Sequence, residues 1–180
     1  MRRLMLFVLG LAAVLVLMPT AAVADSATHT YMLEMEAPNL GTAANGDMVA
    51  ITGDAEFAVN PKSAEGSGTF THTASDGTVR GGGTWTATGL LDYQSYGCGV
   101  VLGTTIPPNF CGGKVRLRVT LTTPAGTLPA TMTVICIIGP NPPNSAFGVD
   151  RRSEGAMLDI PGVINFNHTA GGDNVIIQES

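Results

Sequence analysis

The chain has 180 residues, a formal net charge of −5 and only 13% charged side chains. A mildly acidic chain with few Lys and Arg residues is poorly suited to contact phosphates, so we expect no nucleic-acid partner. The 23 glycines and the many threonines favour an all-β protein, in which Thr covers solvated strand faces and Gly serves turns and bulges.

Residues 1–24 have the pattern of a secretory signal peptide. Two arginines follow the initiator Met, an apolar run extends from Leu4 to Met18, and Ala22-Val23-Ala24 supplies small residues for cleavage before Asp25. We therefore expect a secreted or periplasmic protein of the cell envelope. Cleavage would remove Arg2 and Arg3, and the formal net charge would change from −5 to about −7.

The remaining residues, 25–180, have the length of one all-β domain. No second hydrophobic span follows, so we expect no membrane span after cleavage. The alternative is an uncleaved leader, because Leu4–Val23 is just long enough to cross a bilayer. Pro19 and the Ala-x-Ala site favour cleavage instead.

From Thr28 onward, short runs of β-forming residues alternate with turn signals, and no segment has a convincing helical periodicity. We expect about nine or ten short strands in an antiparallel β-sandwich, with a closed β-barrel as the alternative. The expected strands are Thr30–Glu36, Asp47–Thr52, Ala55–Val59, Gly66–Thr73, Thr78–Thr88, Leu90–Tyr96, Lys114–Thr123, Thr131–Ile138, Gly162–His168 and Val175–Gln178. Residues 97–113 and 139–155 are expected to be long loops, which can be functional or simply variable surface.

The first hairpin can be placed in register from its turn. Asp76-Gly77 is a strong two-residue turn signal, and it pairs Ser75 with Thr78. One face of the hairpin then collects Phe70, His72, Ala74, Val79, Trp85 and Ala87, and the other collects Thr69, Thr71, Thr73, Thr78, Arg80, Thr84 and Thr86. A slip of one residue would mix these sets, so the register supports itself. Trp85 is the only tryptophan and is expected to anchor the core.

The second hairpin turns at Pro124-Ala125-Gly126. Its apolar face is expected to contain Val115, Leu117, Val119 and Leu121 on the first strand and Met132, Val134, Cys136 and Ile138 on the second. Ile135 and Ile137 point the other way, which predicts that the second strand is covered on both faces at its far end. The opposite face of the first strand carries a basic stripe of Lys114, Arg116 and Arg118. We interpret this stripe as a solvated face, with an anionic ligand as the alternative.

The three cysteines allow one intramolecular bridge. We expect Cys98 to bond to Cys111, because the chain between them must loop, and Cys136 to stay reduced in the core. Three free thiols are the alternative.

The histidines are the first candidates for chemistry. Phe70-Thr71-His72-Thr73 resembles Phe166-Asn167-His168-Thr169, so two similar hairpins would place His72 and His168 near a shared rim. His29 also precedes a Thr. Neither His-x-His nor His-x-x-x-His occurs, so we expect no metal ion. No Gly-x-Ser-x-Gly elbow or cofactor motif occurs, and we assign no catalytic residue and no cofactor.

Aromatic residues provide the candidates for a ligand-binding surface. Tyr93 and Tyr96 precede the first long loop, where exposed tyrosines can contact a carbohydrate or a peptide. Buried tyrosines are the alternative. The candidate ligand-binding residues are therefore Tyr93, Tyr96, Phe70, Trp85, His72 and His168. Asn167-His168-Thr169 is a formal N-glycosylation sequon.

These features favour an exported, non-catalytic β domain that acts as a binding or envelope-associated module for an unknown extracellular ligand. A β-barrel that holds a small apolar ligand is the first alternative, and a cavity lined by Phe70 and Trp85 would favour it. A secreted enzyme is the second alternative, and convergence of His72 and His168 with a carboxylate would favour it.

Overall fold

The computed structural model describes residues 29–142 and 154–179, and within these ranges every regular element is a β-strand. The predicted all-β class is therefore confirmed. The strands are β1 (Thr30–Thr42), β2 (Met48–Val59), β3 (Lys62–Thr73), β4 (Val79–Cys98), β5 (Val100–Val101), β6 (Thr104–Thr105), β7 (Phe110–Thr123), β8 (Gly126–Cys136), β9 (Gly155–Ile160), β10 (Ile164–Phe166) and β11 (His168–Gln178).

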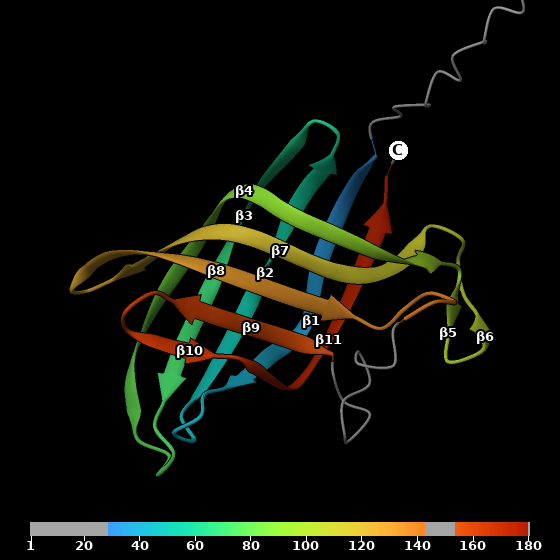
Figure 1. Cartoon of the computed structure of the whole chain (residues 1–180). Coiled ribbons are helices and arrows are strands. Elements are labelled where there is room, and N and C mark those ends of the chain that lie inside the picture. Colours follow the sequence, from blue (N-terminus) through green and yellow to red (C-terminus); the bar gives the residue numbers. More distant parts are fainter. Residues whose placement is uncertain (1–28, 143–153, 180) are drawn as a thin grey trace, which may run out of the picture.

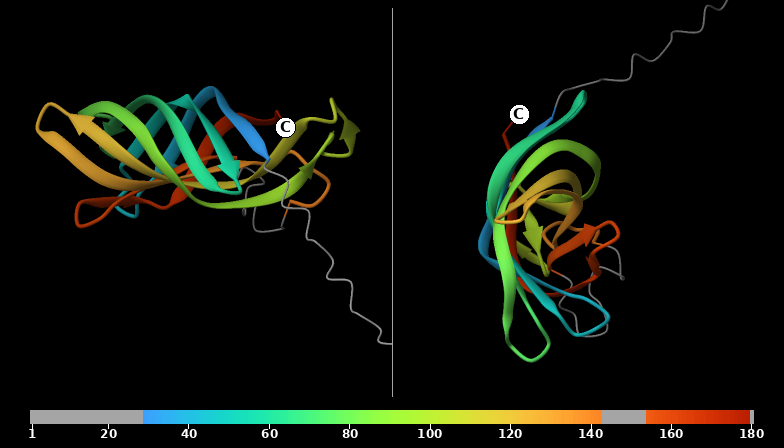
Figure 2. Two further views of the ribbon diagram at one scale, coloured as in Figure 1. Left: turned by 90° about the horizontal axis from the view of Figure 1, so that it is seen from above. Right: turned by 90° about the vertical axis from the view of Figure 1, so that its left-hand side faces the viewer.

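Nine of the described strands form one antiparallel sheet that folds over into two layers (Figure 1). Its order is β10-β9-β8-β7-β11-β1-β2-β3-β4, and β4 also pairs with β7. The first half of β4 pairs with β3 in one layer, and its second half continues along β7 in the other. Figure 2 shows the two layers edge-on, with β1, β2, β3 and β11 on one side and β7 to β10 on the other. This arrangement agrees with the predicted antiparallel sandwich.

The register predicted for the first hairpin is confirmed from the His72–Gly81 pair to the Ser67–Thr86 pair. His72 pairs with Gly81, Phe70 with Gly83 and Gly68 with Trp85. The turn itself differs from the prediction, because the backbone N–H of Ala74 donates to Thr78 O at 2.8 Å. The turn therefore has three residues, and a shift between the His72 and Thr73 pairs restores the predicted register.

Because of this shift, the faces predicted for two residues next to the turn, Val79 and Arg80, are wrong. Thr73 pairs with Val79 and His72 with Gly81, so Arg80 is an extra residue without a partner on β3. A bulge of this kind changes the side-chain alternation locally. Val79, expected on the core face, is 65% exposed, and Arg80, expected on the threonine face, contributes to a pocket described below.

Trp85 anchors the core between the layers, as predicted. It is 1% exposed, and its indole Nε1–H donates to Thr52 O at 2.8 Å. The ring lies across Gly53 and Gly68, where an added Cβ would come within 2.8 and 2.6 Å of it. A side chain at either position would also collide with backbone of the paired strand, with Ser67 O at Gly53 and with Thr52 O at Gly68, so both glycines are required by close packing.

The second hairpin also has the predicted faces, although its loop is shorter. Thr123 pairs with Gly126, which leaves Pro124 and Ala125 as the turn. All the predicted apolar positions are buried except Ile138, which is half-buried beyond the end of β8. Ile135 is half-buried, and it pairs with Gly155 of β9.

Most observed strands are longer than predicted, and four differences change how the elements are divided. β2 runs without a break through Gly53-Asp54, and β4 through Gly89, so two expected pairs of strands are single long strands. The expected loop 139–155 ends in β9, and the expected strand Gly162–His168 is divided among a turn, β10 and the start of β11. Each change follows from pairing with a neighbouring strand, which local sequence patterns do not reveal.

The predicted disulfide is present at one end of β7. Cys98 and Cys111 are paired residues on β4 and β7, and their sulfur atoms are bonded. Cys136 is a buried free thiol. The expected first loop, 97–113, is partly ordered by the β5–β6 hairpin and by the start of β7.

The predicted signal peptide lies outside the described residues. Among the residues that are described, no helix is long and apolar enough to cross a membrane.

Candidate ligand pocket

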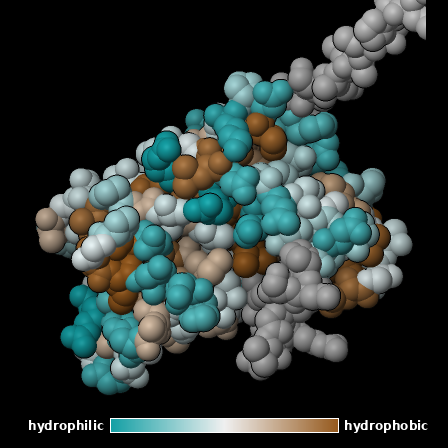
Figure 3. Space-filling view, viewed as in Figure 1, coloured by the Kyte–Doolittle hydropathy of each residue, from teal (hydrophilic) through white to brown (hydrophobic). Residues whose placement is uncertain are grey.

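An apolar pocket opens between the two layers at the end of β7 opposite the disulfide. Its volume is about 390 Å³, within the range of small-molecule sites. One layer contributes Val49 and Phe70, and the other contributes Leu121, Leu158, Ile160 and Phe166. Figure 3 shows apolar side chains gathered at this end of the surface, where the β9–β10 hairpin lies. Val163, in that hairpin's turn, is 64% exposed beside the opening.

A glycine on β4, Gly81, borders the open space of the pocket. Gly81 and Gly82 line the pocket, and on the neighbouring strand β3 they pair with His72 and Thr71. A Cβ added at Gly81 would meet no heavy atom within 4 Å, so this position borders empty volume. Gly81 therefore borders a gap that a larger side chain at this position would fill.

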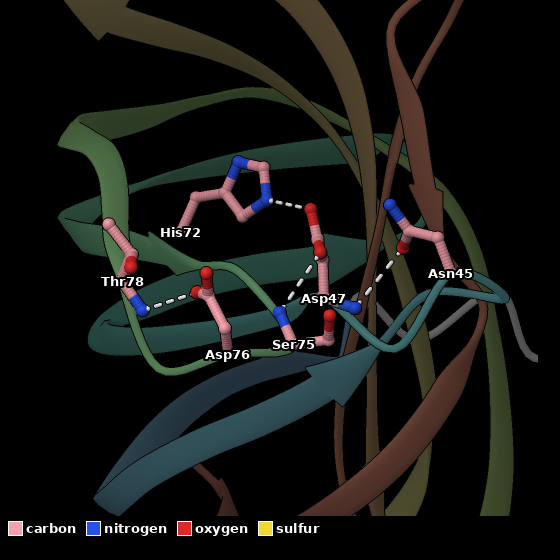
Figure 4. A network of polar contacts seen from close by, with 6 residues as sticks. All are labelled: Asn45, Asp47, His72, Ser75, Asp76 and Thr78. Atoms are coloured by element: carbon pink, nitrogen blue, oxygen red, sulfur yellow. Dashed lines mark hydrogen bonds and ion pairs between the residues drawn. The ribbon is translucent and has the colours of Figure 1, made fainter.

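His72 and Asp47 form a hydrogen-bonded pair at the wall of the pocket. Figure 4 shows His72, from β3, and Asp47, from the β1–β2 turn, pointing toward one another. His72 Nε2 donates to Asp47 Oδ2 at 2.8 Å, and the backbone N–H of Ser75 donates to Asp47 Oδ1 at 3.2 Å. The hydrogen bond from His72 lowers the pKa of the Asp47 carboxyl. The contact connects the β1–β2 and β3–β4 turns.

The His72 ring also contacts the opposite layer. Its centroid lies 5.2 Å from that of Phe166 in an edge-on geometry. The side chain is 25% exposed. Among the described residues, Asp47 is the only hydrogen-bond partner of the His72 imidazole. The pair resembles a base oriented by a carboxylate, although no hydroxyl or thiol of a described residue is hydrogen-bonded to the imidazole.

The candidate residues from the sequence separate into three places. Phe70 and His72 line the pocket, whereas Trp85 lies in the core and is not part of the lining. Tyr96 is 3% exposed. Tyr93 packs 5.0 Å from Tyr31, centroid to centroid, and its hydroxyl donates to Gly112 O at 3.3 Å. Tyr96 thus follows the buried alternative, and Tyr93 is half-buried, with its hydroxyl bonded and its ring packed against the core.

His168 is not near the site that contains His72. It is exposed at the start of β11, where it pairs with Thr42 of β1, and it does not line the pocket. The two Phe-x-His-Thr segments are not equivalent hairpins, because Phe166 ends β10 and His168 begins β11. It is Phe166, from the second segment, that meets His72.

The basic stripe on β7 lies on the outer face, away from the pocket. Arg116 and Arg118 are exposed, and Lys114 is half-buried. This placement agrees with the solvated-face interpretation.

A separate polar cluster is buried between the layers. The side chains of Asn39 and Asn174 exchange two hydrogen bonds of 2.8 Å, and Asn174 Nδ2 also donates to Ile135 O. The backbone N–H of Asn174 donates to Glu154 Oε1 at 3.2 Å, and the thiol of Cys136 donates to Asn174 O at 3.1 Å. Partners are thus present for the buried polar groups, which indicates a structural role.

Burial controls the ionisation of this cluster. It raises the pKa of Glu154 to about 7 and that of the Cys136 thiol to about 12. Cys136 is therefore a poor nucleophile at neutral pH. Within the described ranges, no group of three or more His, Cys, Asp or Glu side chains is arranged to hold a metal ion.

Sequence reasoning missed Asp47, Arg80 and Phe166 as parts of this end of the molecule. Asp47 was expected to start a strand, and its partner His72 is 25 positions away. Arg80 reaches the pocket because of the bulge in β4.

Comparisons with protein-family models, with curated proteins and with solved structures gave no match to this chain.

Proposed function

We propose that this protein is an exported, non-catalytic binding module that holds a small apolar ligand in the pocket between its layers. The observation that carries the proposal is the apolar pocket itself. Val49, Phe70, Leu121 and Leu158 offer dry contact area from both layers, and Val163 leaves apolar surface at the opening. Such an opening is costly in water unless a ligand or partner covers it.

Two features support export. The leader pattern of residues 1–24 is the first, and the Cys98–Cys111 disulfide, compatible with an oxidising compartment, is the second. The same disulfide connects β4 and β7 at the end opposite the pocket, so the two strands that form part of the pocket are held together at their far ends.

A pocket-filling variant tests the binding function. Gly81→Phe places a ring in the empty volume, because no atom lies within 4 Å of the position of the new Cβ. The matched control is Thr71→Phe, which adds an exposed ring on the opposite face of β3. A neutral apolar fluorophore, N-phenyl-1-naphthylamine, should bind the wild type and Thr71→Phe, and binding should fall at least tenfold in Gly81→Phe. Equal binding by all three proteins would locate the fluorophore elsewhere and contradict the proposal.

A second candidate, a secreted hydrolase, is favoured by the His72–Asp47 contact alone. A histidine oriented by a carboxylate can act as a general base toward water or a substrate hydroxyl. This function predicts that the protein hydrolyses p-nitrophenyl butyrate and that His72→Ala abolishes the activity. The binding function predicts no turnover above that of His72→Ala.

A further inference from the structure

The charge around the pocket indicates the chemical class of the ligand. Among the described residues that line the pocket there is no carboxylate, and Arg80 is the only side chain with a permanent charge. The Asp47 carboxylate lies behind the His72 ring and does not line the pocket. The pocket is therefore apolar in its interior and positive at the position of Arg80.

The Arg80 guanidinium is free to bind an anion. It forms no ion pair with any described residue. Asp76, in the adjacent turn, interacts with Arg80 only at longer range, and its Oδ1 accepts a hydrogen bond of 2.9 Å from the backbone N–H of Thr78. The guanidinium thus retains five N–H donors in a fork that fits a carboxylate with two parallel hydrogen bonds.

The bulge explains why this cation is at the opening. In a regular strand, Arg80 would share the outer face with Thr84 and Thr86. The extra residue in β4 leaves Arg80 without a pairing partner, and Arg80 contributes to the lining next to Gly81 and Gly82. An apolar interior, with one unpaired arginine beside it, is complementary to an amphipathic anion.

Building on the proposed binding function, we infer that the ligand is a free long-chain carboxylate. Its alkyl chain lies among Phe70, Leu121, Leu158 and Phe166, and its carboxylate pairs with Arg80. A single guanidinium matches one planar carboxylate. A cationic head group would be repelled by Arg80, and a neutral head group would gain nothing from the positive charge of the guanidinium.

Three amphiphiles with the same chain test this inference: dodecanoate, dodecanol and dodecyltrimethylammonium. The two ions are titrated calorimetrically below their micelle concentrations, and dodecanol below its solubility limit. Dodecanoate should bind the wild type about tenfold or more tightly than dodecanol, the range of charge-assisted hydrogen bonds, and the cation should bind most weakly. Arg80→Gln should remove the advantage of dodecanoate and leave dodecanol unchanged. Arg80→Lys should retain part of it, because the charge remains without the fork.

The control is Arg118→Gln, which removes an exposed arginine from the outer face of β7 and should change none of the three affinities. Dodecanol binding by Arg80→Gln also reports that the variant is folded. Equal affinities of dodecanoate and dodecanol for the wild type, or an unchanged preference in Arg80→Gln, would overturn the inference while the apolar pocket stands. Absence of dodecanol binding to the wild type would overturn the proposed function as well. Preferential binding to vesicles of anionic phospholipid over free dodecanoate would assign the arginine to a lipid surface and also overturn the inference.

Discussion

His72 Nε2 lies 2.8 Å from Asp47 Oδ2, and this hydrogen bond connects β3 to the β1–β2 turn at the wall of the pocket. It joins residues 25 positions apart and fixes the imidazole edge-on to Phe166. The pair therefore contributes to the shape of the pocket as well as to the contact between two turns.

Removing the imidazole should loosen this end of the molecule. His72→Ala deletes the donor to Asp47 and the ring contact with Phe166, and we expect Tm to fall by roughly 2–4 °C, the shift that corresponds to about 1 kcal/mol in a domain of this size. Differential scanning calorimetry measures the change. The control, Thr71→Ala, alters an exposed neighbour and should leave Tm unchanged. Equal values of Tm for wild type and His72→Ala would show that the contact does not stabilise the fold.

The same contact predicts a loss of stability in acid. Because the hydrogen bond from His72 lowers the pKa of Asp47 in the folded state, the pair stabilises the fold above the ordinary pKa of an aspartate. This contribution disappears as the pH falls through the lowered value. Asp47→Asn should therefore be less stable than the wild type at pH 7, and the difference should shrink toward pH 2. A difference independent of pH would contradict this role of the carboxylate.

Trp85 should be the most costly of these side chains to truncate. Trp85→Ala removes a ring that is 1% exposed and leaves Thr52 O without its indole donor, so we expect a loss of about 3–5 kcal/mol in urea unfolding. Thr84→Ala, one residue away on the outer face, should cost less than about 0.5 kcal/mol. Similar losses at both positions would be incompatible with the register of the β3–β4 hairpin.

The disulfide should stabilise the fold through the loop that it closes. Cys98 and Cys111 are 13 positions apart, and closure of a loop of this length is worth about 3 kcal/mol. The double variant Cys98→Ala/Cys111→Ala should lose about this amount. Peptide mapping under non-reducing conditions should recover Cys98 linked to Cys111 and Cys136 as a thiol. A linkage that includes Cys136 would contradict its position in the core.

Glu154 should make the fold less stable as the pH rises. Burial raises its pKa to about 7 in the folded protein, above the value of 4.5 for an unburied Glu, so the folded state binds the proton more tightly. Stability should then fall between about pH 4.5 and pH 7, by on the order of 2–3 kcal/mol.

Glu154→Gln tests this dependence, because the amide oxygen can still accept from Asn174 N without carrying charge. The variant should be more stable than the wild type at pH 8 and similar to it at pH 4.5. Glu65→Gln, at an exposed position on β3, is the control and should follow the wild type. Parallel stability curves for Glu154→Gln and the wild type would contradict the burial of a charged carboxylate.

Much of the fold could be predicted because its two main hairpins are local. Alternation of side chains and the turn signals place Phe70 opposite Gly83, and they bury Val115 and Leu117, as observed. The strand β9 was missed although Ala156, Leu158 and Ile160 alternate with less buried residues. Its pairing partner, β8, lies on the far side of a Pro-rich segment, and such a connection carries no local signal.

The site was less predictable because it depends on contacts between distant residues. Phe70 and His72 were recognised as candidates from one hairpin. Asp47 joins them only through the pairing of β2 with β3, and Phe166 only when the two layers pack together. The position of Arg80 depends on a bulge that follows from a three-residue turn where two residues were expected. The dipeptide Asp76-Gly77 predicts a turn, but it does not determine whether that turn has two residues or three.

The most direct test of the binding site is a methyl NMR titration of the wild type with dodecanol. If the pocket holds the apolar chain, the methyl resonances of Leu121, Leu158 and Val163 should shift together and saturate at one ligand per protein. The methyls of Val101 and of Leu102, which is 76% exposed near the disulfide, should not move. Shifts confined to Leu102 and its neighbours, or no saturable shift at the three pocket residues, would contradict a ligand pocket between the layers.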